Sequence, residues 1–530
     1  MPLGDEKHNR IYQELVNTLG ADYVEDDPAV MEAFYRDALT PLFMSKGRAE
    51  FIVLPGNTEQ VQHILRLANR LQFPFSVTST GLNQQSCNAV AGVPYWCIID
   101  PKRMDRLEID EDNMYAIVEP YVTIAQLQAE AMKHGLFCGV PGASSQASVL
   151  AGNVFQSIHW TGWRTGVGRS VLGVEWVLPS GDILRTGSLA LPGAGYCWGE
   201  GPGPDGRGLL RGHIGHLGSL GVVTRMAVKL YPWPGPHIWP TEGVQPEKKS
   251  VLPKDKVRSY FISFPTLEKS IDAIREMGKA EIAGLVMKFT PWDFVCWATR
   301  SFEEFWKVWN SEFWAEQRDK GHQVWVELWG FTSEKQLKYE EKVLKHIIEE
   351  YEGQLLPDEI HQWLDATLTP NAVRDTHRNR FTRIGGRVMV TGATMDSLYD
   401  VLRSAKIDLP FKDKYTPPLG YMGNSIKFWP FDFGRLAWTE VDAIAEKSPE
   451  LDGMIEKEVT PEMAKLAIQN SAAPTGTVGA VAQLGRYFYN IHMLLGEIKH
   501  GLDPKNIANP TRCIDMREME KRGITFKSGT

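Results

Sequence analysis

Three loops built from glycine and small or hydroxyl side chains constrain the fold of this chain more than any other feature. They span residues 76–83, 141–153 and 212–221, and strands are predicted between them. Small residues let the backbone come close to a ligand, and N–H groups around a glycine turn suit an anion such as a diphosphate. Alone, the first loop also fits an ordinary strand-to-helix turn. Three such loops within 235 residues predict one shared binding site.

The chain length predicts more than one domain. Single hydrophobic cores stop growing at about 250–300 residues, and this chain has 530. A proline-rich entry at 234–240, followed by a lysine pair at 248–249, marks a linker. We therefore predict a ligand-binding domain over 1–235, an inserted substrate or cap domain over 236–480, and a C-terminal segment over 481–530.

Local patterns predict alternating strands and helices in the first domain. Asn57 has the position of an N-cap residue with Gln60 three residues later, between predicted strands at 51–54 and 74–78. Thr123 and Gln126 form a capping box for a helix that ends at Gly135. Further strands are predicted at 116–119, at 174–178 with a turn at 179–182 and a return strand at 183–184, and at 221–230.

The rest of the chain carries weaker patterns. Ser333 is a plausible N-cap for a helix over 334–351, and a strand is predicted within 385–391. A helix is predicted over 481–500, ended by the sequence at 502–504. No internal repeat is visible.

Charge and cysteine content exclude several classes of protein. Lysine and arginine number 57 against 65 aspartates and glutamates, a net charge of −8, so there is no basic excess for a nucleic acid. The six cysteines include no CxxC pair, and His213 and His216 have no metal-binding partner nearby in sequence, so no metal site is predicted. The GxGxxG match at 201–206 follows no predicted strand and contains prolines, so a nicotinamide site is not predicted either.

Targeting and membrane signals are also missing from the sequence. The N-terminal residues are charged and contain no apolar core of a signal peptide, so we expect a cytoplasmic protein. The longest stretch without charged residues, 134–163, is rich in glycine, serine, glutamine and asparagine. A membrane span needs about 20 predominantly apolar residues, so no membrane span is predicted.

An ordered set of motifs resembles the FAD-linked oxidase family of vanillyl-alcohol oxidase and p-cresol methylhydroxylase. The resemblance covers about 200 N-terminal residues and the last 30 or so. The motifs are PGNTEQVQHILRLAN at 55–69, SVTSTGLN at 76–83, YAIVEPYVT at 115–123, SVLAGN at 148–153, LGVEWVLPSGDILRTG at 172–187, GHLGSLGVVT at 215–224 and LDPKNIANP at 502–510.

The resemblance implies an α+β fold, with a two-subdomain FAD-binding lobe of this type and an inserted antiparallel-sheet cap. It also implies FAD as the cofactor and a homodimer. Arg512 would stabilise the anionic reduced flavin, although Thr511 stands where relatives have glycine. The implied FAD-binding residues are Thr78, Ser79, Thr80, Gly81, Leu82, Asn83, Pro141, Gly142, Ser148, Gly152, Asn153, His216, Val223 and Arg512.

The chain departs from the phenol-oxidising relatives at the substrate side. Residues 84–87 contain no tyrosine where those relatives place one, and Gln156 stands where they have an acid. Their Tyr-Arg pair is not visible near 470–473. The resemblance therefore does not extend to the usual phenolate-binding pocket.

His159 and Arg164 are the candidate catalytic residues. They end the uncharged tract, where a histidine can take a hydroxyl proton and an arginine can bind a carboxylate or oxyanion. The alternative is that Arg164 forms a structural pair and His159 is an ordinary loop histidine.

The resulting prediction is an FAD-dependent oxidase or dehydrogenase. It would transfer hydride to the flavin from a small-molecule alcohol, hydroxy acid or activated benzylic carbon, and pass electrons to oxygen or a carrier protein. The alternatives are a flavoprotein subunit without its own turnover and a non-redox enzyme of the alkyl-glycerone-phosphate synthase type. We expect noncovalent FAD, because the first loop lacks the histidine that some relatives use; other candidate anchors are Cys87, Cys138, His361 and Tyr421.

Overall fold

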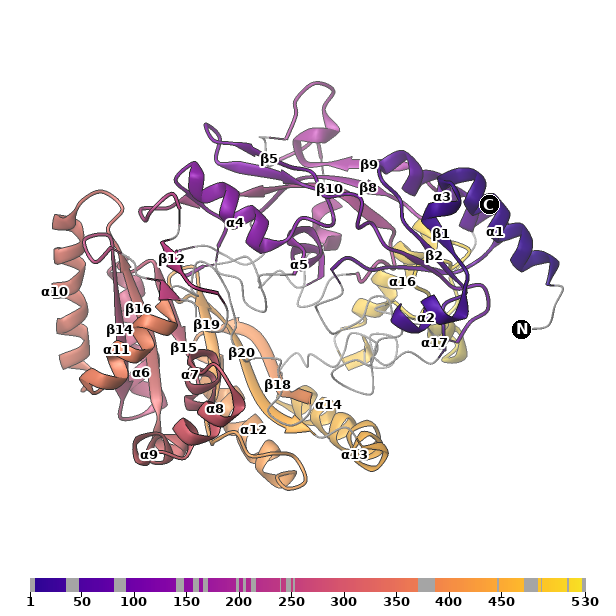
Figure 1. Cartoon of the computed structure of the whole chain (residues 1–530). Coiled ribbons are helices and arrows are strands. Elements are labelled where there is room, and N and C mark those ends of the chain that lie inside the picture. The colour runs from indigo at the N-terminus through magenta and orange to yellow at the C-terminus, as the bar shows by residue number, and fades with distance from the viewer. Residues whose placement is uncertain are drawn as a thin grey trace.

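The computed structural model consists of an N-terminal lobe, a cap lobe over residues 253–470, and a C-terminal segment that returns to the N-terminal lobe (Figure 1). It describes residues 5–34, 47–80, 92–139, 147–155, 162–164, 170–196, 200–203, 206–210, 216–238, 240–244, 249–250, 253–369, 387–445, 448–470, 485–487, 489–511 and 514–526.

The first sheet of the N-terminal lobe has strand order β1-β2-β4-β3. Strands β2, β4 and β3 are parallel, and β1 pairs antiparallel with β2. As predicted, the Asn57 side chain accepts a hydrogen bond from the Gln60 N–H and starts α3, which packs its apolar face on this sheet. The elements are α1 (Glu6–Leu19), a 3-10 turn (Ala21–Tyr23), β1 (Val24–Glu25), α2 (Pro28–Phe34), β2 (Phe51–Val53), α3 (Thr58–Leu71), β3 (Phe75–Val77) and β4 (Cys97–Ile99).

The second sheet of this lobe is antiparallel, with strand order β5-β6-β10-β8-β9. The predicted capping box of Thr123 and Gln126 is present at the start of α4. The elements are β5 (Leu107–Asp110), β6 (Tyr115–Val118), α4 (Ile124–Lys133), β7 (Leu136–Phe137), α5 (Val149–Phe155), β8 (Val171–Val177), β9 (Ile183–Thr186), 3-10 turns Gly187–Ala190 and Gly206–Leu210, β10 (Val222–Lys229) and β11 (Tyr231–Pro232), which pairs with β7.

The predicted linker contains a short hairpin of β12 (Thr241–Glu242) and β13 (Lys249–Ser250). The domain boundaries at residues 235 and 480 stay predictions.

The cap lobe is built on one antiparallel sheet with strand order β17-β14-β16-β15-β19-β20-β18. Helices α6, α10 and α12 cover one face, and α7, α8, α9 and α11 pack into the other, tryptophan-rich core. The strands are β14 (Val257–Phe264), β15 (Leu285–Lys288), β16 (His322–Trp329), β17 (Gln354–Leu355), β18 (Arg387–Ser397), β19 (Lys427–Phe431) and β20 (Leu436–Ala445).

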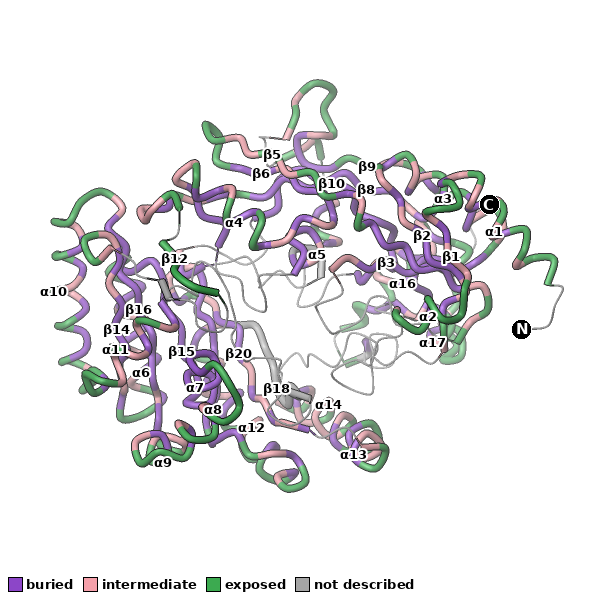
Figure 2. Tube along the Cα trace, viewed as in Figure 1, coloured by how far each residue is buried: buried purple, intermediate pink, exposed green. Residues whose placement is uncertain are grey.

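The cap helices follow ordinary start signals, and Ser333 caps α10 as predicted. Figure 2 shows their buried sides turned toward the sheet. They are α6 (Leu267–Lys279), α7 (Pro291–Ala298), α8 (Phe302–Trp309), α9 (Glu312–Lys320), α10 (Glu334–Glu350), α11 (Asp358–Thr367), α12 (Asp400–Lys414), α13 (Pro449–Met454), a π-helical turn (Ile455–Val459) and α14 (Thr460–Gln469).

The C-terminal helices α16 (Ile491–Leu502) and α17 (Met516–Lys521) pack into the core of the N-terminal lobe, as the yellow helices of Figure 1 show. The single helix predicted over 481–500 is wrong. A 3-10 turn (Gly485–Tyr487) is followed by Tyr489 and Asn490 at φ of 52° and 62°, a left-handed backbone that interrupts a helix. Residues 481–484 lie outside the described residues.

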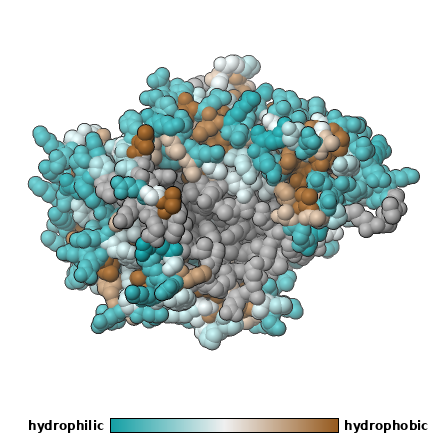
Figure 3. Space-filling model, viewed as in Figure 1, coloured by the Kyte–Doolittle hydropathy of each residue, from teal (hydrophilic) through white to brown (hydrophobic). Residues whose placement is uncertain are grey.

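The outer flanks of both lobes are mainly hydrophilic on the face drawn in Figure 3. In the described part of the chain, no helix combines the length and the apolar composition that a membrane crossing needs.

Candidate functional site

The first predicted loop begins at the carboxyl edge of the parallel strands. Thr78 follows β3, and its N–H donates to the Ile99 carbonyl at the end of β4 over 2.9 Å. The Thr78 side chain is buried, while Ser79 and Thr80 are half-buried. Ligands of open α/β sheets bind outside this edge. The role of these hydroxyl residues in binding the cofactor stays a prediction.

The third predicted loop lies directly against the first. A Cβ atom added to Gly218, at φ 76°, would come within 3.8 Å of the Val77 side chain at the end of β3. Gly221, at φ 115°, has no such room, because its Cβ would lie 2.3 Å from the Val177 carbonyl. The turn then enters β10, where Val223 is buried and pairs with Trp176 of β8.

Lys499 of α16 fastens the C-terminal segment to this turn. Its buried Nζ donates to the Ser219 carbonyl at 2.7 Å, to the Asp503 carboxylate at 2.6 Å and to the Ala508 carbonyl at 2.6 Å. Asn509 adds a bond from Nδ2 to the Leu217 carbonyl at 2.6 Å. Lys499 was not predicted from the sequence; its i, i+4 spacing from Asp503 is the signal that could have indicated it.

His216 is a buried histidine at the start of the 216–221 turn. Its ring is 3% exposed and stacks on Trp176 with centroids 5.1 Å apart. Burial, and then the charge of Lys499, lower the pKa of His216 to about 3. Nδ1 accepts the Leu220 N–H over 3.4 Å, so Nε2 carries the proton. Within the described chain, neither this Nε2 nor Ser219 Oγ has a hydrogen-bond partner.

The second predicted loop is held by Ser148 at its end. The Ser148 hydroxyl donates to the Pro120 carbonyl at 2.6 Å and accepts the Ala151 N–H at 3.0 Å. Gly152 N–H donates to the Ser148 carbonyl at 2.9 Å. Val149 and Leu150 of α5 share a core with Leu220 and Val223, so this loop ends beside the 216–221 turn.

Several predicted site residues lie outside the described residues, and their roles stay predictions. They are Gly81, Leu82, Asn83, Pro141, Gly142, His159 and Arg512, together with the side chain of Asn153. Residues 84–87 and Gln156 also lie outside.

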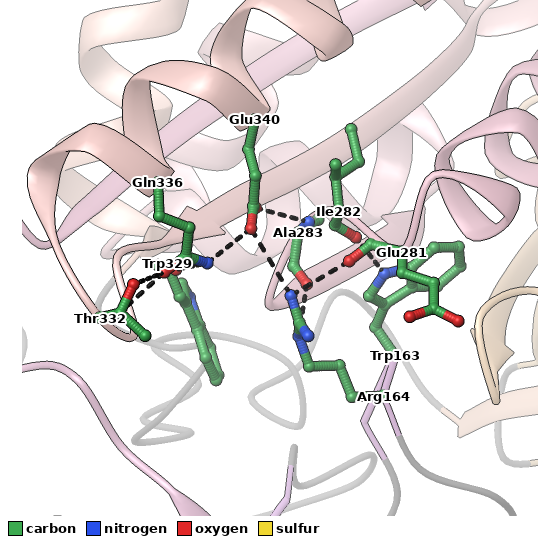
Figure 4. Close-up of polar contacts among 9 residues, drawn as sticks. All are labelled: Trp163, Arg164, Glu281, Ile282, Ala283, Trp329, Thr332, Gln336 and Glu340. Atoms are coloured by element: carbon green, nitrogen blue, oxygen red, sulfur yellow. Dashed lines mark hydrogen bonds and ion pairs between the residues drawn. The ribbon is translucent and has the colours of Figure 1, made fainter.

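Arg164 reaches from the N-terminal lobe into the cap lobe (Figure 4). Its Nε donates to the Ala283 carbonyl at 2.8 Å, and its Nη2 donates to the Glu281 carbonyl at 3.4 Å and lies 3.8 Å from Glu340 Oε1. The guanidinium also stacks on Phe331, 4.6 Å from the ring centroid. These contacts are those of a structural pair, the alternative to substrate binding.

Trp163 completes this contact between the lobes. Its indole N–H donates to the Ile282 carbonyl at 2.7 Å, and its carbonyl accepts the Phe433 N–H at 2.7 Å. Glu340 is fixed independently, because it accepts the Ala283 N–H at 3.0 Å and the Gln336 amide at 2.6 Å. We call Trp163, Arg164 and Glu340 the interlobe clasp.

Two candidate flavin anchors are poorly suited to attachment. Burial raises the pKa of the Cys138 thiol to about 12, which keeps it protonated and unreactive. The Tyr421 hydroxyl is bonded to Asp319, and burial raises its pKa.

The family described as FAD binding domain matches residues 49–187. Residues 49–187 are therefore similar to an FAD binding domain. The match includes the first two predicted loops and β8, and FAD is the cofactor predicted from the sequence.

The whole fold is that of p-cresol methylhydroxylase. The structure of that enzyme with substrate bound superposes with a TM-score of 0.74 at 19% identity, covering 97% of this chain and 98% of that one. Alkyldihydroxyacetonephosphate synthase also superposes, with a TM-score of 0.60 at 16% identity, covering 94% of this chain and 85% of that one. The predicted α+β fold is therefore confirmed.

Sequence relatives match part of this chain. The glycolate oxidase subunit of Bacillus subtilis is 32% identical over 228 residues, which are 42% of this chain and 45% of that protein. The chain spans about half the length of the curated relatives it matches.

The described residues of the FAD-binding lobe fit this cofactor. The N–H of His216 and the hydroxyl of Ser219 are buried and, within the described chain, unpartnered, in the turn whose Gly218 lies against Val77 at the end of β3. Neutral donors of this kind suit the oxygen atoms of a dinucleotide.

Proposed function

We propose that this protein is an FAD-dependent oxidase or dehydrogenase that acts on a small molecule. When bound, FAD supplies a flavin N5 that takes hydride from an alcohol, a hydroxy acid or an activated benzylic carbon. The observation that carries the proposal is the pair of buried polar atoms, on His216 and Ser219, that lack a partner in the described chain, in a lobe that matches an FAD binding domain and adjoins a cap lobe.

The names of the similar proteins support two of the three substrate classes. One relative is a glycolate oxidase subunit, which points to a hydroxy acid, and the best-superposing structure named above is p-cresol methylhydroxylase, which points to a benzylic carbon. We propose His159 as the base, while Thr78, Ser79, Thr80, His216 and Val223 line the cofactor. For Arg164 we propose the structural alternative to binding a substrate anion, because its guanidinium is bonded to backbone carbonyls of the cap lobe.

Assembly and location complete the proposal. We propose a homodimer in the cytoplasm that passes electrons to oxygen or to a carrier protein. Buried free thiols at Cys97 and Cys138 are in keeping with a reducing compartment. Sedimentation analysis of the purified protein tests the dimer.

The experiment is to release the flavin and then reduce it with substrates. Purified protein should be yellow, and acid precipitation should leave FAD in the supernatant, identified by mass spectrometry. Anaerobic titration with one alcohol, one 2-hydroxy acid and one alkylphenol should bleach the flavin with at least one of them.

Other outcomes contradict the proposal in different ways. Recovery of FMN alone, or no binding of FAD at micromolar concentration, would show that FAD is not the cofactor. FAD that binds but is bleached by no member of a broad panel favours a non-redox enzyme of the alkyl-glycerone-phosphate synthase type, or a subunit without turnover.

A further inference from the structure

Strand β16 carries a carboxyl group into the tryptophan-rich core of the cap lobe. Alternate residues of a strand point to one face, so Trp325, Glu327 and Trp329 share the face that packs with α7 and α11. Glu327 is 0% exposed, and Trp325 and Trp329 are 1% and 2% exposed. A carboxyl buried this completely needs partners for both of its oxygen atoms.

Only half of that requirement is met within the described chain. Glu327 Oε2 accepts the indole N–H of Trp329 at 2.9 Å, whereas Oε1 has no hydrogen-bond partner among the described residues. The indole N–H of Trp325, two residues away on the same face, has no partner there either. The face therefore offers a buried donor and a buried carboxyl oxygen on side chains two residues apart along one strand, neither of them partnered in the described chain.

This pair lies where the cap lobe meets the FAD-binding lobe. The Trp329 ring packs edge-on against Phe137, with centroids 5.1 Å apart, and against Trp233, 5.2 Å apart. Phe137 ends β7, four residues before Pro141, the first residue of the predicted second FAD loop. Glu327 is thus connected through Trp329 to β7, the strand that precedes that loop in the sequence.

The charges around Glu327 favour its neutral form. Burial raises the pKa of Glu327 to about 8, the charge of Asp365 adds to this, and Lys254 opposes it. Across the strand pair, Ser259 of β14 has its hydroxyl bonded to Thr369 at 2.6 Å, and Thr369 bonds to Asp365 at 2.8 Å. A neutral carboxyl among aromatic rings suits an uncharged polar group better than an anion.

We propose that Glu327 and Trp325 bind the oxygen of an uncharged aromatic or similarly apolar alcohol against the tryptophans of the cap lobe. The inference rests on the proposed function and narrows its substrate classes, because a hydroxy acid would bring a second carboxylate to this face. The hydroxyl would accept from the Trp325 N–H and exchange a hydrogen bond with Glu327 Oε1.

The test compares two ligands with the same ring and different head groups. Benzyl alcohol and benzoate are titrated calorimetrically into the FAD-loaded protein, below and above about pH 8. Wild type should bind benzyl alcohol more tightly than benzoate. The ratio of the two dissociation constants should grow about tenfold or more as the pH rises, because ionised Glu327 repels benzoate. Glu327→Gln should remove this pH dependence, and Trp325→Phe should weaken alcohol binding alone.

Two control variants separate Glu327 from other titrating carboxyls. Asp365→Asn removes a charge that raises the pKa of Glu327, so the pH dependence should move to lower pH. Asp408→Asn should leave the pH dependence of binding unchanged, although burial also raises the pKa of the Asp408 carboxyl on α12 to about 7. The carbonyl stretch of protonated Glu327 in infrared difference spectra reports folding and protonation without turnover.

The proposal is overturned if Glu327→Gln and Trp325→Phe leave both affinities unchanged in folded, FAD-loaded protein. Buried water would then satisfy the two groups. Binding is measured without flavin reduction, so an enzyme that binds benzyl alcohol through Glu327 yet is bleached by no substrate contradicts only the proposed function.

Discussion

At the scale of single residues, Lys499 and Asp503 form an ion pair that is fully buried. Both side chains are 0% exposed. The ammonium group has its three acceptors, and the carboxylate accepts the N–H groups of Ile507 and Ala508 at 3.1 and 2.9 Å. The pair links α16, the 216–221 turn and the strand edge beside β3. Its loss should therefore affect both folding and the FAD site.

Lys499→Met should lower the free energy of unfolding by about 3–5 kcal/mol, because it leaves a buried carboxylate without its cation. It should also weaken FAD binding, since the Ser219 carbonyl loses its anchor. Urea unfolding and FAD titration measure the two effects. Lys505→Met is the matched control, because the exposed amine of Lys505 donates to the Asn69 carbonyl. This variant should lower the free energy of unfolding by no more than about 0.5 kcal/mol. Equal losses in both variants would contradict the anchoring role.

Residue types in motifs were predictable from the sequence, whereas their partners were not. The hydroxyl residues after β3 and the histidine at 216 follow from loop composition and order, whereas the neutral state of His216 depends on its burial in the folded chain. The contacts of Arg164 do not, because its acceptors at Glu281, Ala283 and Glu340 lie more than 100 residues away. Nothing in local spacing encodes such pairs.

At the scale of elements, the 216–221 turn depends on one glycine. Gly221 has φ 115° and its Cβ position lies 2.3 Å from the Val177 carbonyl and 3.0 Å from Trp176 Nε1. Gly221→Ala should destabilise the protein by about 2–4 kcal/mol through backbone strain and overpacking, and should reduce FAD content.

Gly208→Ala is the control for that variant. Gly208 lies in a 3-10 turn, and no atom of the described chain is within 4 Å of its Cβ position. The melting temperature of the Gly208→Ala variant should therefore match that of wild type within a degree or two. Normal FAD content and stability in Gly221→Ala would show that the turn can relax, contrary to this prediction.

Element starts were predictable because capping is local chemistry. Asn57, Thr123 and Ser333 each accept the expected backbone N–H. Element ends were harder: β18 runs on to Ser397, and the left-handed Tyr489 and Asn490 break the helix predicted over 481–500. Both outcomes depend on tertiary neighbours rather than on spacing.

At the scale of the whole molecule, the FAD-binding lobe was predictable and the interior of the cap lobe was not. The FAD-binding lobe contains an ordered set of loop motifs, and the backbone of these loops must come close to a cofactor. The cap lobe is held by aromatic packing, such as Trp325 against Phe261 and Trp292 against Trp309, which many sequences can supply. Its antiparallel sheet followed from the resemblance alone.

The two lobes are joined at the interlobe clasp, which a double-mutant cycle can test. Arg164→Met should lower the free energy of unfolding by about 1–3 kcal/mol, because Glu340 loses its cation while keeping the bonds from Ala283 and Gln336. Glu340→Gln should cost a similar amount, and the double variant less than the sum, since the two side chains act through one contact.

Flavin reduction in the same variants decides between the two roles of Arg164. If the clasp is structural, both variants should reduce the flavin at similar rates once FAD is bound, because neither group touches the substrate. If Arg164 binds a substrate anion, Arg164→Met should be slowed by about 2–4 kcal/mol of activation free energy while Glu340→Gln is not. The bonds from Arg164 to the Ala283 and Glu281 carbonyls favour the first result, since they fix the guanidinium to the cap backbone. Selective slowing of Arg164→Met, with normal FAD content, would show that its remaining N–H groups serve the substrate.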